Sequence, residues 1–182
     1  TEAAGDVWPD RSAPYLRSVS DPYCASSAAA AWRQTISLAD LTVVLRELPG
    51  VSFRGPLRDI TIVNHDASGR ARTLRLLGNS SQPVDANAFR YAVNRQLGWN
   101  TLKSNFYTVA RRGGEMVFAG RGLGHGVGLC QTGADQMGRM GILFDKILAH
   151  YFPGAILESS GGQGAARILS SEHFELVFPP RQ

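Results

Sequence analysis

The sequence lacks the features that mark membrane proteins, repeat proteins and disulfide-rich scaffolds. No apolar run approaches the ~20 residues that span a bilayer, and no internal repeat, low-complexity tract or long linker is visible. Two cysteines, Cys24 and Cys130, are too few for a disulfide framework. The first residues lack the basic and apolar stretches of a signal peptide. That absence leaves the compartment open.

Positive charge is present but not concentrated. The 182 residues include 19 Lys and Arg against 15 Asp and Glu, so the formal net charge is +4 and the isoelectric point is near 9.4. The arginines are scattered, whereas a nucleic-acid binder of this size usually shows a dense basic stripe. We therefore expect no nucleic-acid partner, and a weak positive field would suit other anionic polymers.

The rest of the composition predicts one folded α+β domain. Hydrophobic residues make up 43% and charged residues 19%, which is ordinary for a globular chain. Residues 1–35, rich in Ser, Ala and Pro, predict an irregular extended segment packed on a body at 36–182. We expect antiparallel hairpins and three to four short helices. The predicted helices are 38–48, 85–97, 130–140 and 144–151; the hairpins pair 59–63 with 72–77 and 106–109 with 116–118; a last strand covers 174–178.

A run of alternating glycines is the most informative segment. From Gly120 to Gly128, every second residue is glycine, and His125 stands between Gly124 and Gly126. Glycine permits positive φ and close backbone approach at an entropic cost that a plain connector seldom justifies. A backbone passing beneath a bulky ligand would need such residues. The pattern therefore predicts that His125 faces a ligand.

Two other interpretations compete with ligand binding, and one of them stays open. A dinucleotide loop requires G-x-G-x-x-G after a strand of a βαβ unit, with an acidic residue ~20 positions on, and the sequence meets neither condition. A purely structural interpretation makes the glycines a tight crossing and His125 a hydrogen-bonded core histidine. The residues alone do not separate the structural interpretation from the ligand-binding one.

Residues 120–154 closely resemble the signature of the stage II sporulation protein D family, which includes the amidase enhancer LytB. The stretch GRGLGHGVGLCQTGA at 120–134 and the stretch ILAHYFPG at 147–154 are similar to its GHGVGxxQxGA core and IL-x-HYxPG helix end. Earlier pieces agree in order, from Trp8 to Ser104-Asn105-Phe106. The resemblance covers nearly the whole chain.

The resemblance implies a cell-envelope role on peptidoglycan. Family members are lytic transglycosylases, which cleave after N-acetylmuramic acid and leave a 1,6-anhydro product. One carboxyl group suffices, first as acid and then as base. The family's catalytic glutamate lies in an upstream alanine-rich helix, and Thr1-Glu2 resembles the T-E that follows it. We therefore expect the C-terminal portion of such a protein and assign no catalytic residue within the chain.

Within that interpretation, the resemblance implies a glycan-binding role for this chain and no required cofactor. The glycine segment approaches the sugars, His125 and Gln131 hydrogen-bond to them, and Tyr151 lines the groove. The glycines concerned are Gly122, Gly124, Gly126 and Gly128. The alternative is a non-catalytic wall-binding module that stimulates a cell-wall amidase, as the name of one family member suggests.

The cysteines leave four alternatives open. A Cys24–Cys130 disulfide would suit an envelope protein and close a loop of about a hundred residues. Zinc bound by Cys24, Cys130 and His125 is a second alternative, because some relatives bind zinc near this site, and it would leave a fourth position open. Unbonded thiols are the third. A Cys130–His125 nucleophile is the fourth, although no third orienting group is identifiable.

Overall fold

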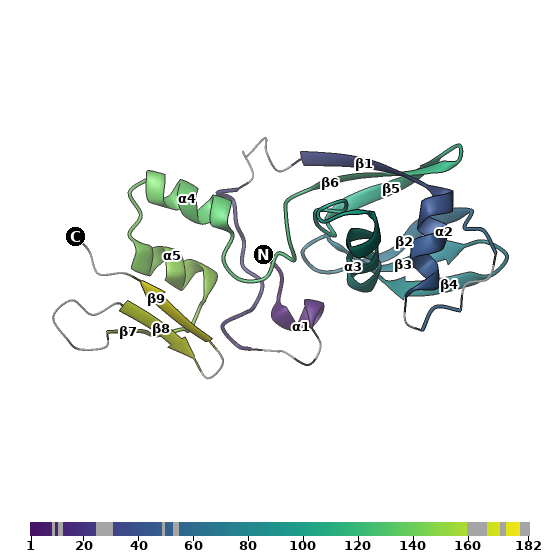
Figure 1. Cartoon of the computed structure of the whole chain (residues 1–182). Helices are drawn as coiled ribbons and strands as arrows, with labels where there is room; N and C mark the ends of the chain where they lie inside the picture. The colour runs from purple at the N-terminus through teal and green to yellow at the C-terminus, as the bar shows by residue number, and fades with distance from the viewer. Residues whose placement is uncertain are drawn as a thin grey trace. The chain divides into compact units, whose positions relative to one another are not determined.

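The computed structural model describes residues 1–182 except 9, 11–12, 25–30, 49, 53–54, 160–166, 172–173 and 179–182. Contacts group the chain into two compact units (Figure 1). The terminal unit consists of Thr1–Ser26 and Val127–Gln182, and the central unit is Ser27–Gly126. The boundary between the units falls inside the glycine motif. The prediction of one domain over residues 1–182 stays a prediction.

Among its described residues, the central unit contains two three-stranded antiparallel sheets and two helices. The first sheet has the order β1-β6-β5, with β1 at Ala31–Ser37, β6 at Glu115–Arg121 and β5 at Tyr107–Arg112. The second has the order β2-β3-β4, with β2 at Asp59–His65, β3 at Ala71–Leu77 and β4 at Ser81–Asp85. The helices are α2 at Leu38–Arg46 and α3 at Ala86–Leu97.

Both central helices begin at capping residues, Ser37 and Asp85. The Ser37 hydroxyl accepts the Asp40 N–H at 2.9 Å, and the Asp85 carboxylate accepts the Ala88 N–H at 2.9 Å. Each bond satisfies a donor that a helix N-terminus would otherwise leave unpaired, which contributes about 1 kcal/mol. At its other end, α3 stops at Gly98, whose φ of 114° lies outside the helical range.

One apolar core fills the central unit. The leucines and valines of α2, the apolar face of α3 and the inner faces of the strands meet there, and the rings of Tyr107 and Phe118 pack edge to face at 5.4 Å. Each fully buried side chain of this size contributes about 1.5–3 kcal/mol. The fully buried members include Leu41, Val44, Leu45, Ile60, Leu74, Leu76, Phe89, Val93, Leu102, Met116 and Phe118.

The terminal unit joins the two ends of the chain in a second core. Its elements are α1 at Ala4–Val7, α4 at Gln131–Arg139, α5 at Phe144–Tyr151 and the antiparallel sheet β7-β8-β9, formed by Leu157–Ser159, Arg167–Ser171 and Phe174–Phe178. Helices α4 and α5 bury Met137, Leu148 and Tyr151 against side chains of residues 15–23. A parallel bridge between Glu2 and Val127 adds a backbone link.

The α+β class is confirmed, and the predicted helices and hairpins are present within a few residues. Helix α5 coincides with the predicted range 144–151. The described residues form five helices, whereas three to four were predicted. The helix that was missed is α1, which is four residues long and too short to show a hydrophobic periodicity. The prediction of an irregular segment over residues 1–35 also missed strand β1, which begins at Ala31. This strand pairs with the distant β6, so that Ala31 lies opposite Arg121. In the part of the chain that is described, no helix has the length and apolarity to cross a bilayer.

Candidate functional site

The glycine loop continues β6 into α4 with a left-handed backbone at every second residue. Gly122, Gly124, Gly126 and Gly128 have φ of 72°, 73°, 80° and 74°. A Cβ at Gly122 or Gly124 would meet open space. Glycine is therefore needed at these two positions for the backbone conformation and not to avoid a clash.

Three hydrogen bonds fix the first half of the loop on the central unit. The Trp32 indole N–H donates to the Gly122 carbonyl at 3.1 Å, and the Gly124 N–H donates to the Lys103 carbonyl at 2.8 Å. The Ser104 hydroxyl donates to the Arg121 carbonyl at 2.7 Å. Because both neighbours of Leu123 are held, the segment that leads to His125 is ordered before any ligand arrives.

His125 is an exposed residue in this anchored loop. Part of its ring is nevertheless desolvated, and this burial, with the charges of Arg90 and Arg70, lowers the pKa of His125 below its ordinary value of 6.5. The imidazole is therefore neutral at neutral pH. A neutral imidazole offers one N–H donor and one nitrogen acceptor, a combination that suits hydroxyl groups.

Arginines surround the same part of the central unit. Arg121 lies over the Phe106 ring, 3.9 Å from its centroid, and Arg70 lies over that ring at 5.4 Å. Arg70 also packs against Gly126, where any Cβ would overlap its guanidinium. Arg90 is buried. This environment favours anionic or strongly polar groups beside His125.

The second half of the motif belongs to the terminal unit. Cys130 caps α4, and its sulfur accepts the Gly133 N–H at 3.4 Å. Gln131, the first residue of α4, is exposed, so its amide is accessible. Tyr151 is fully buried, and its hydroxyl donates to the Asp21 carboxylate at 3.0 Å. We therefore leave Tyr151 out of the binding surface, because no face of its ring is open to a sugar.

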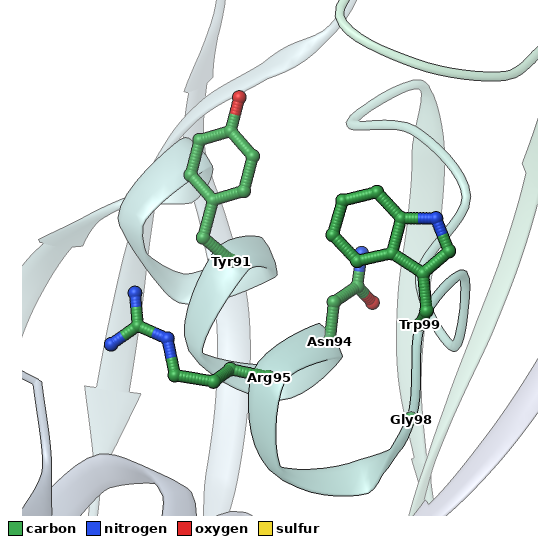
Figure 2. Close-up of a pocket in the computed structure, with 5 residues that line it drawn as sticks. All are labelled: Tyr91, Asn94, Arg95, Gly98 and Trp99. Atoms are coloured by element: carbon green, nitrogen blue, oxygen red, sulfur yellow. The ribbon is translucent and has the colours of Figure 1, made fainter.

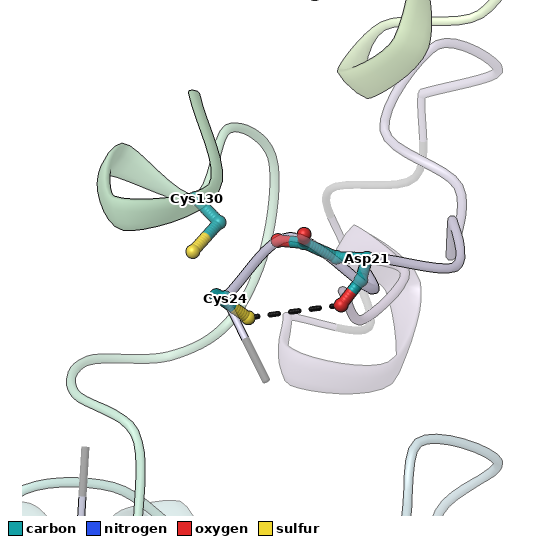
Figure 3. Close-up of side chains that lie close together, drawn as sticks. All are labelled: Asp21, Cys24 and Cys130. Atoms are coloured by element: carbon teal, nitrogen blue, oxygen red, sulfur yellow. Dashed lines mark hydrogen bonds between the residues drawn. The ribbon is translucent and has the colours of Figure 1, made fainter. Parts of the chain in front are cut away.

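Asp21, Cys24 and Cys130 come together in the terminal unit (Figure 3). One carboxylate oxygen and the two sulfurs all lie within 4.8 Å of one another. The Cys24 thiol donates to the Asp21 carbonyl at 3.7 Å. Burial, with Cys130 and Asp21 close by, raises the pKa of Cys24 to about 11. Without a nearby cation, that thiol stays protonated at neutral pH.

The cluster shows that Cys24 and Cys130 lie close together, as a disulfide or a shared metal ion would require. It does not distinguish a disulfide, a metal site and two unbonded thiols. Both cysteines are half-buried thiols in this structure. The predicted third zinc ligand, His125, belongs to the central unit, and the group beside the two sulfurs is Asp21. Sequence reasoning missed Asp21, because nothing in the stretch Asp21-Pro22-Tyr23-Cys24 signals that it meets Cys130.

A second surface feature that sequence reasoning missed lies at the end of α3 (Figure 2). Tyr91, Asn94, Arg95, Gly98 and Trp99 line an open pocket of about 460 Å³. Trp99 is 81% exposed, and Figure 2 shows its indole standing clear of the helix. A lone tryptophan after a helix carries no pattern from which its exposure could be predicted.

The turn that carries Trp99 is ordered by its own hydrogen bonds. The Thr101 hydroxyl donates to the Gly98 carbonyl at 2.7 Å. The Asn94 Oδ1 accepts the Leu102 N–H at 2.8 Å, and the Asn94 Nδ2 donates to the Leu102 carbonyl at 3.0 Å. Asn100 adopts a left-handed φ of 67°. The indole is therefore presented by a fixed turn.

The chain is similar in sequence to two stage II sporulation D proteins and to an amidase enhancer. The chain is 28% identical over 154 residues to stage II sporulation protein D of Bacillus amyloliquefaciens and 27% identical over 154 residues to that of Bacillus subtilis. The chain is SpoIID/LytB-like. The amidase enhancer of Bacillus subtilis is 35% identical over 63 residues, which are 35% of this chain and 9% of that protein.

The likeness to SpoIID extends over 85% of this chain and 40% of each of the two SpoIID relatives. The chain thus spans about two fifths of the length of these curated proteins. No protein-family model matches it. The resemblance stated from the glycine motif is confirmed at the level of the SpoIID/LytB-like family.

Proposed function

We propose that this SpoIID/LytB-like chain binds peptidoglycan glycan strands as part of a lytic transglycosylase in the cell envelope. The observation that carries the proposal is the anchored glycine loop, in which left-handed glycines present an exposed, neutral His125. The likeness to stage II sporulation protein D supports the cell-wall context. The activity of the whole protein is part of the same proposal.

The side chains of the central unit suit a sugar polymer that carries carboxylates. Neutral His125 would hydrogen-bond to sugar hydroxyls. Arg70 and Arg90 set a positive potential at His125, which would favour the lactyl carboxylate of a muramyl residue. The exposed face of Trp99 offers a flat apolar surface for the C–H face of a further sugar.

Lytic cleavage requires one catalytic carboxyl group, and we assign that role to no residue of this chain. In lytic cleavage, the bond between C1 of N-acetylmuramic acid and the bridging oxygen breaks, and the leaving oxygen takes a proton from a carboxylic acid. The 6-hydroxyl attacks C1 and returns its proton to the carboxylate. A single group serves both steps only if its pKa is raised, usually by burial. In this proposal, the present residues bind and orient the strand.

Binding to peptide-free glycan strands tests the proposal. We expect the chain to bind them in isothermal titration calorimetry, and His125→Ala to weaken the affinity by about tenfold to a hundredfold, the loss of one or two hydrogen bonds to a polar ligand. The matched control is His65→Ala, which removes an exposed histidine at the end of β2. Equal affinity of His125→Ala and wild type would remove His125 from the site.

An amidase-stimulating module is the second candidate, favoured by the 35% identity to the amidase enhancer over 63 residues. Mass spectrometry of strands incubated with the protein separates the two. Release of 1,6-anhydromuramyl products by the full-length protein supports the transglycosylase. Strand binding without such products, together with faster peptide release by a cell-wall amidase when the chain is added, supports the module.

A further inference from the structure

The terminal unit holds three potential metal ligands from distant parts of the chain. Asp21 and Cys24 precede the central unit, whereas Cys130 follows it. Their ligand atoms lie within 4.8 Å of one another. In a tetrahedral zinc site, Zn–S and Zn–O bonds of roughly 2.3 and 2.1 Å place ligand atoms about 3.4–3.8 Å apart. Side-chain rotations that move each atom by less than about 1 Å would close the difference.

The carboxylate of this set is already oriented. Its Oδ1 accepts the Tyr23 N–H at 3.1 Å, and its Oδ2 accepts the buried Tyr151 hydroxyl at 3.0 Å. Both oxygens retain further lone pairs, so these bonds leave room for a cation. Hydrogen bonds of this kind typically fix metal-binding carboxylates.

Helix α4 is built to admit this arrangement. A Cβ at Gly133 would overlap the Tyr151 hydroxyl and lie 2.7 Å from Asp21 Oδ1. Glycine at this position therefore permits the carboxylate to lie against the first turn of α4. On that turn, Cys130 accepts the Gly133 N–H, and a thiolate at a helix N-terminus is favoured by the backbone dipoles.

The chemistry of the ligands selects the metal. Two sulfurs exclude Mg²⁺ and Ca²⁺, which prefer an all-oxygen shell. Two thiolates with one carboxylate suit Zn²⁺. A disulfide would use the same sulfurs, yet it gives no role to a carboxylate held beside them by two hydrogen bonds.

We propose that Asp21, Cys24 and Cys130 bind one Zn²⁺ ion through one carboxylate oxygen and two thiolate sulfurs. The fourth tetrahedral position is open to water or another ligand, and each thiol releases its proton to solvent on binding. The ion would link residues 21–24 to the start of α4. This site does not depend on the glycan proposal.

Metal binding by the reduced, metal-free chain tests the site, with Zn²⁺ and Co²⁺ alone as probes. We expect one Zn²⁺ per chain by atomic emission, and a Co²⁺ complex with thiolate charge-transfer bands and tetrahedral d–d bands. At Zn²⁺ a hundredfold above Kd, Tm should rise by about 5–10 °C. A phosphine serves as reductant, because it does not supply thiols.

Variants identify the ligands. Cys24→Ser and Cys130→Ser should each weaken Zn²⁺ binding by at least about a hundredfold, and Asp21→Asn by about tenfold to a hundredfold. The matched control is Asp135→Asn, an exposed carboxylate of α4 that pairs with Arg139. Circular dichroism checks that each variant folds, and loss of the Co²⁺ thiolate bands is a readout that a purely structural change would not give.

Three outcomes overturn the proposal. The first is a reduced, folded chain that takes up less than about a tenth of an equivalent of Zn²⁺, while non-reducing peptide mapping of the same protein before reduction finds Cys24 joined to Cys130; that pair of results assigns a disulfide. The second is unchanged Zn²⁺ affinity in Cys24→Ser or Cys130→Ser. The third is loss of zinc in His125→Ala with full retention in Asp21→Asn, which assigns His125 as the third ligand.

Discussion

The central and terminal units are stabilised in different ways. In the central unit, hairpins between near neighbours in sequence, the pairing of β1 with β6 and two capped helices enclose one large apolar core. In the terminal unit, the chain ends are joined by individual long-range contacts. The Tyr151 hydroxyl reaches Asp21 across 130 positions, and Glu2 bridges to Val127. The candidate binding loop is anchored on the central unit, and the candidate metal ligands lie in the terminal unit.

This difference predicts which single substitutions lower the stability of each unit. In the central unit many buried side chains contribute to stability, so a large loss requires a clash with the backbone or a large ring. In the terminal unit a small group at one position can displace a polar cluster.

Gly120→Ala should destabilise the central unit most, by about 3 kcal/mol. The added Cβ would overlap the Trp32 ring and lie 2.9 Å from the Phe106 carbonyl, and neither can move without disturbing β1 or β5. Urea unfolding measures the loss. The control is Gly114→Ala in the same hairpin, where nothing lies within 4 Å. A loss of less than 1 kcal/mol in Gly120→Ala would mean that the ring moves at little cost.

Gly133→Ala should destabilise the terminal unit by about 2 kcal/mol, because the methyl group displaces the Tyr151 hydroxyl and the Asp21 carboxylate. Thermal unfolding followed by circular dichroism gives the change. Gly138→Ala is the control on the same helix; its Cβ meets open space, and helix propensity predicts a gain of up to about 1 kcal/mol. Equal stability of both variants would contradict tight packing around Asp21.

Gly124→Ala should cost about 1–2 kcal/mol, because an L side chain at φ of 73° is strained although space is available. Since the loop carries His125, glycan affinity should fall together with stability. Calorimetric titration against peptide-free strands measures the affinity. Gly113→Ala has a φ of 61° with open space, and it should show the same stability loss without the loss of binding.

The smallest effect concerns protonation of His125. Because its pKa lies below 6.5 in the folded chain, the unfolded chain binds this proton more readily between the lowered pKa and 6.5. The His125 contribution to stability should therefore fall as pH falls through that window. Arg70→Met removes a repelling charge and should raise the pKa of His125 toward its ordinary value. An NMR titration of the imidazole resonances tests this; a pKa that falls or stays unchanged would contradict it.

The elements that were predicted well depend on signals within a few residues. Ser37 and Asp85 mark helix starts because a cap bonds an N–H three residues on. The alternating glycines indicated a special backbone, and φ is positive at four of the five. Strand β1 escaped prediction, because its pairing partner, β6, lies far along the chain.

Local patterns in the sequence were sufficient to predict the α+β class, the four longer helices, the hairpins and the SpoIID/LytB-like resemblance carried by the glycine motif. Each follows from local backbone preference or from a contiguous motif. The tertiary structure alone decided that Asp21 lies beside Cys24 and Cys130, that Tyr151 is buried against it, and that Trp99 is exposed. Cys130 and Tyr151 lie more than a hundred positions from Asp21, and no local pattern encodes that they meet it.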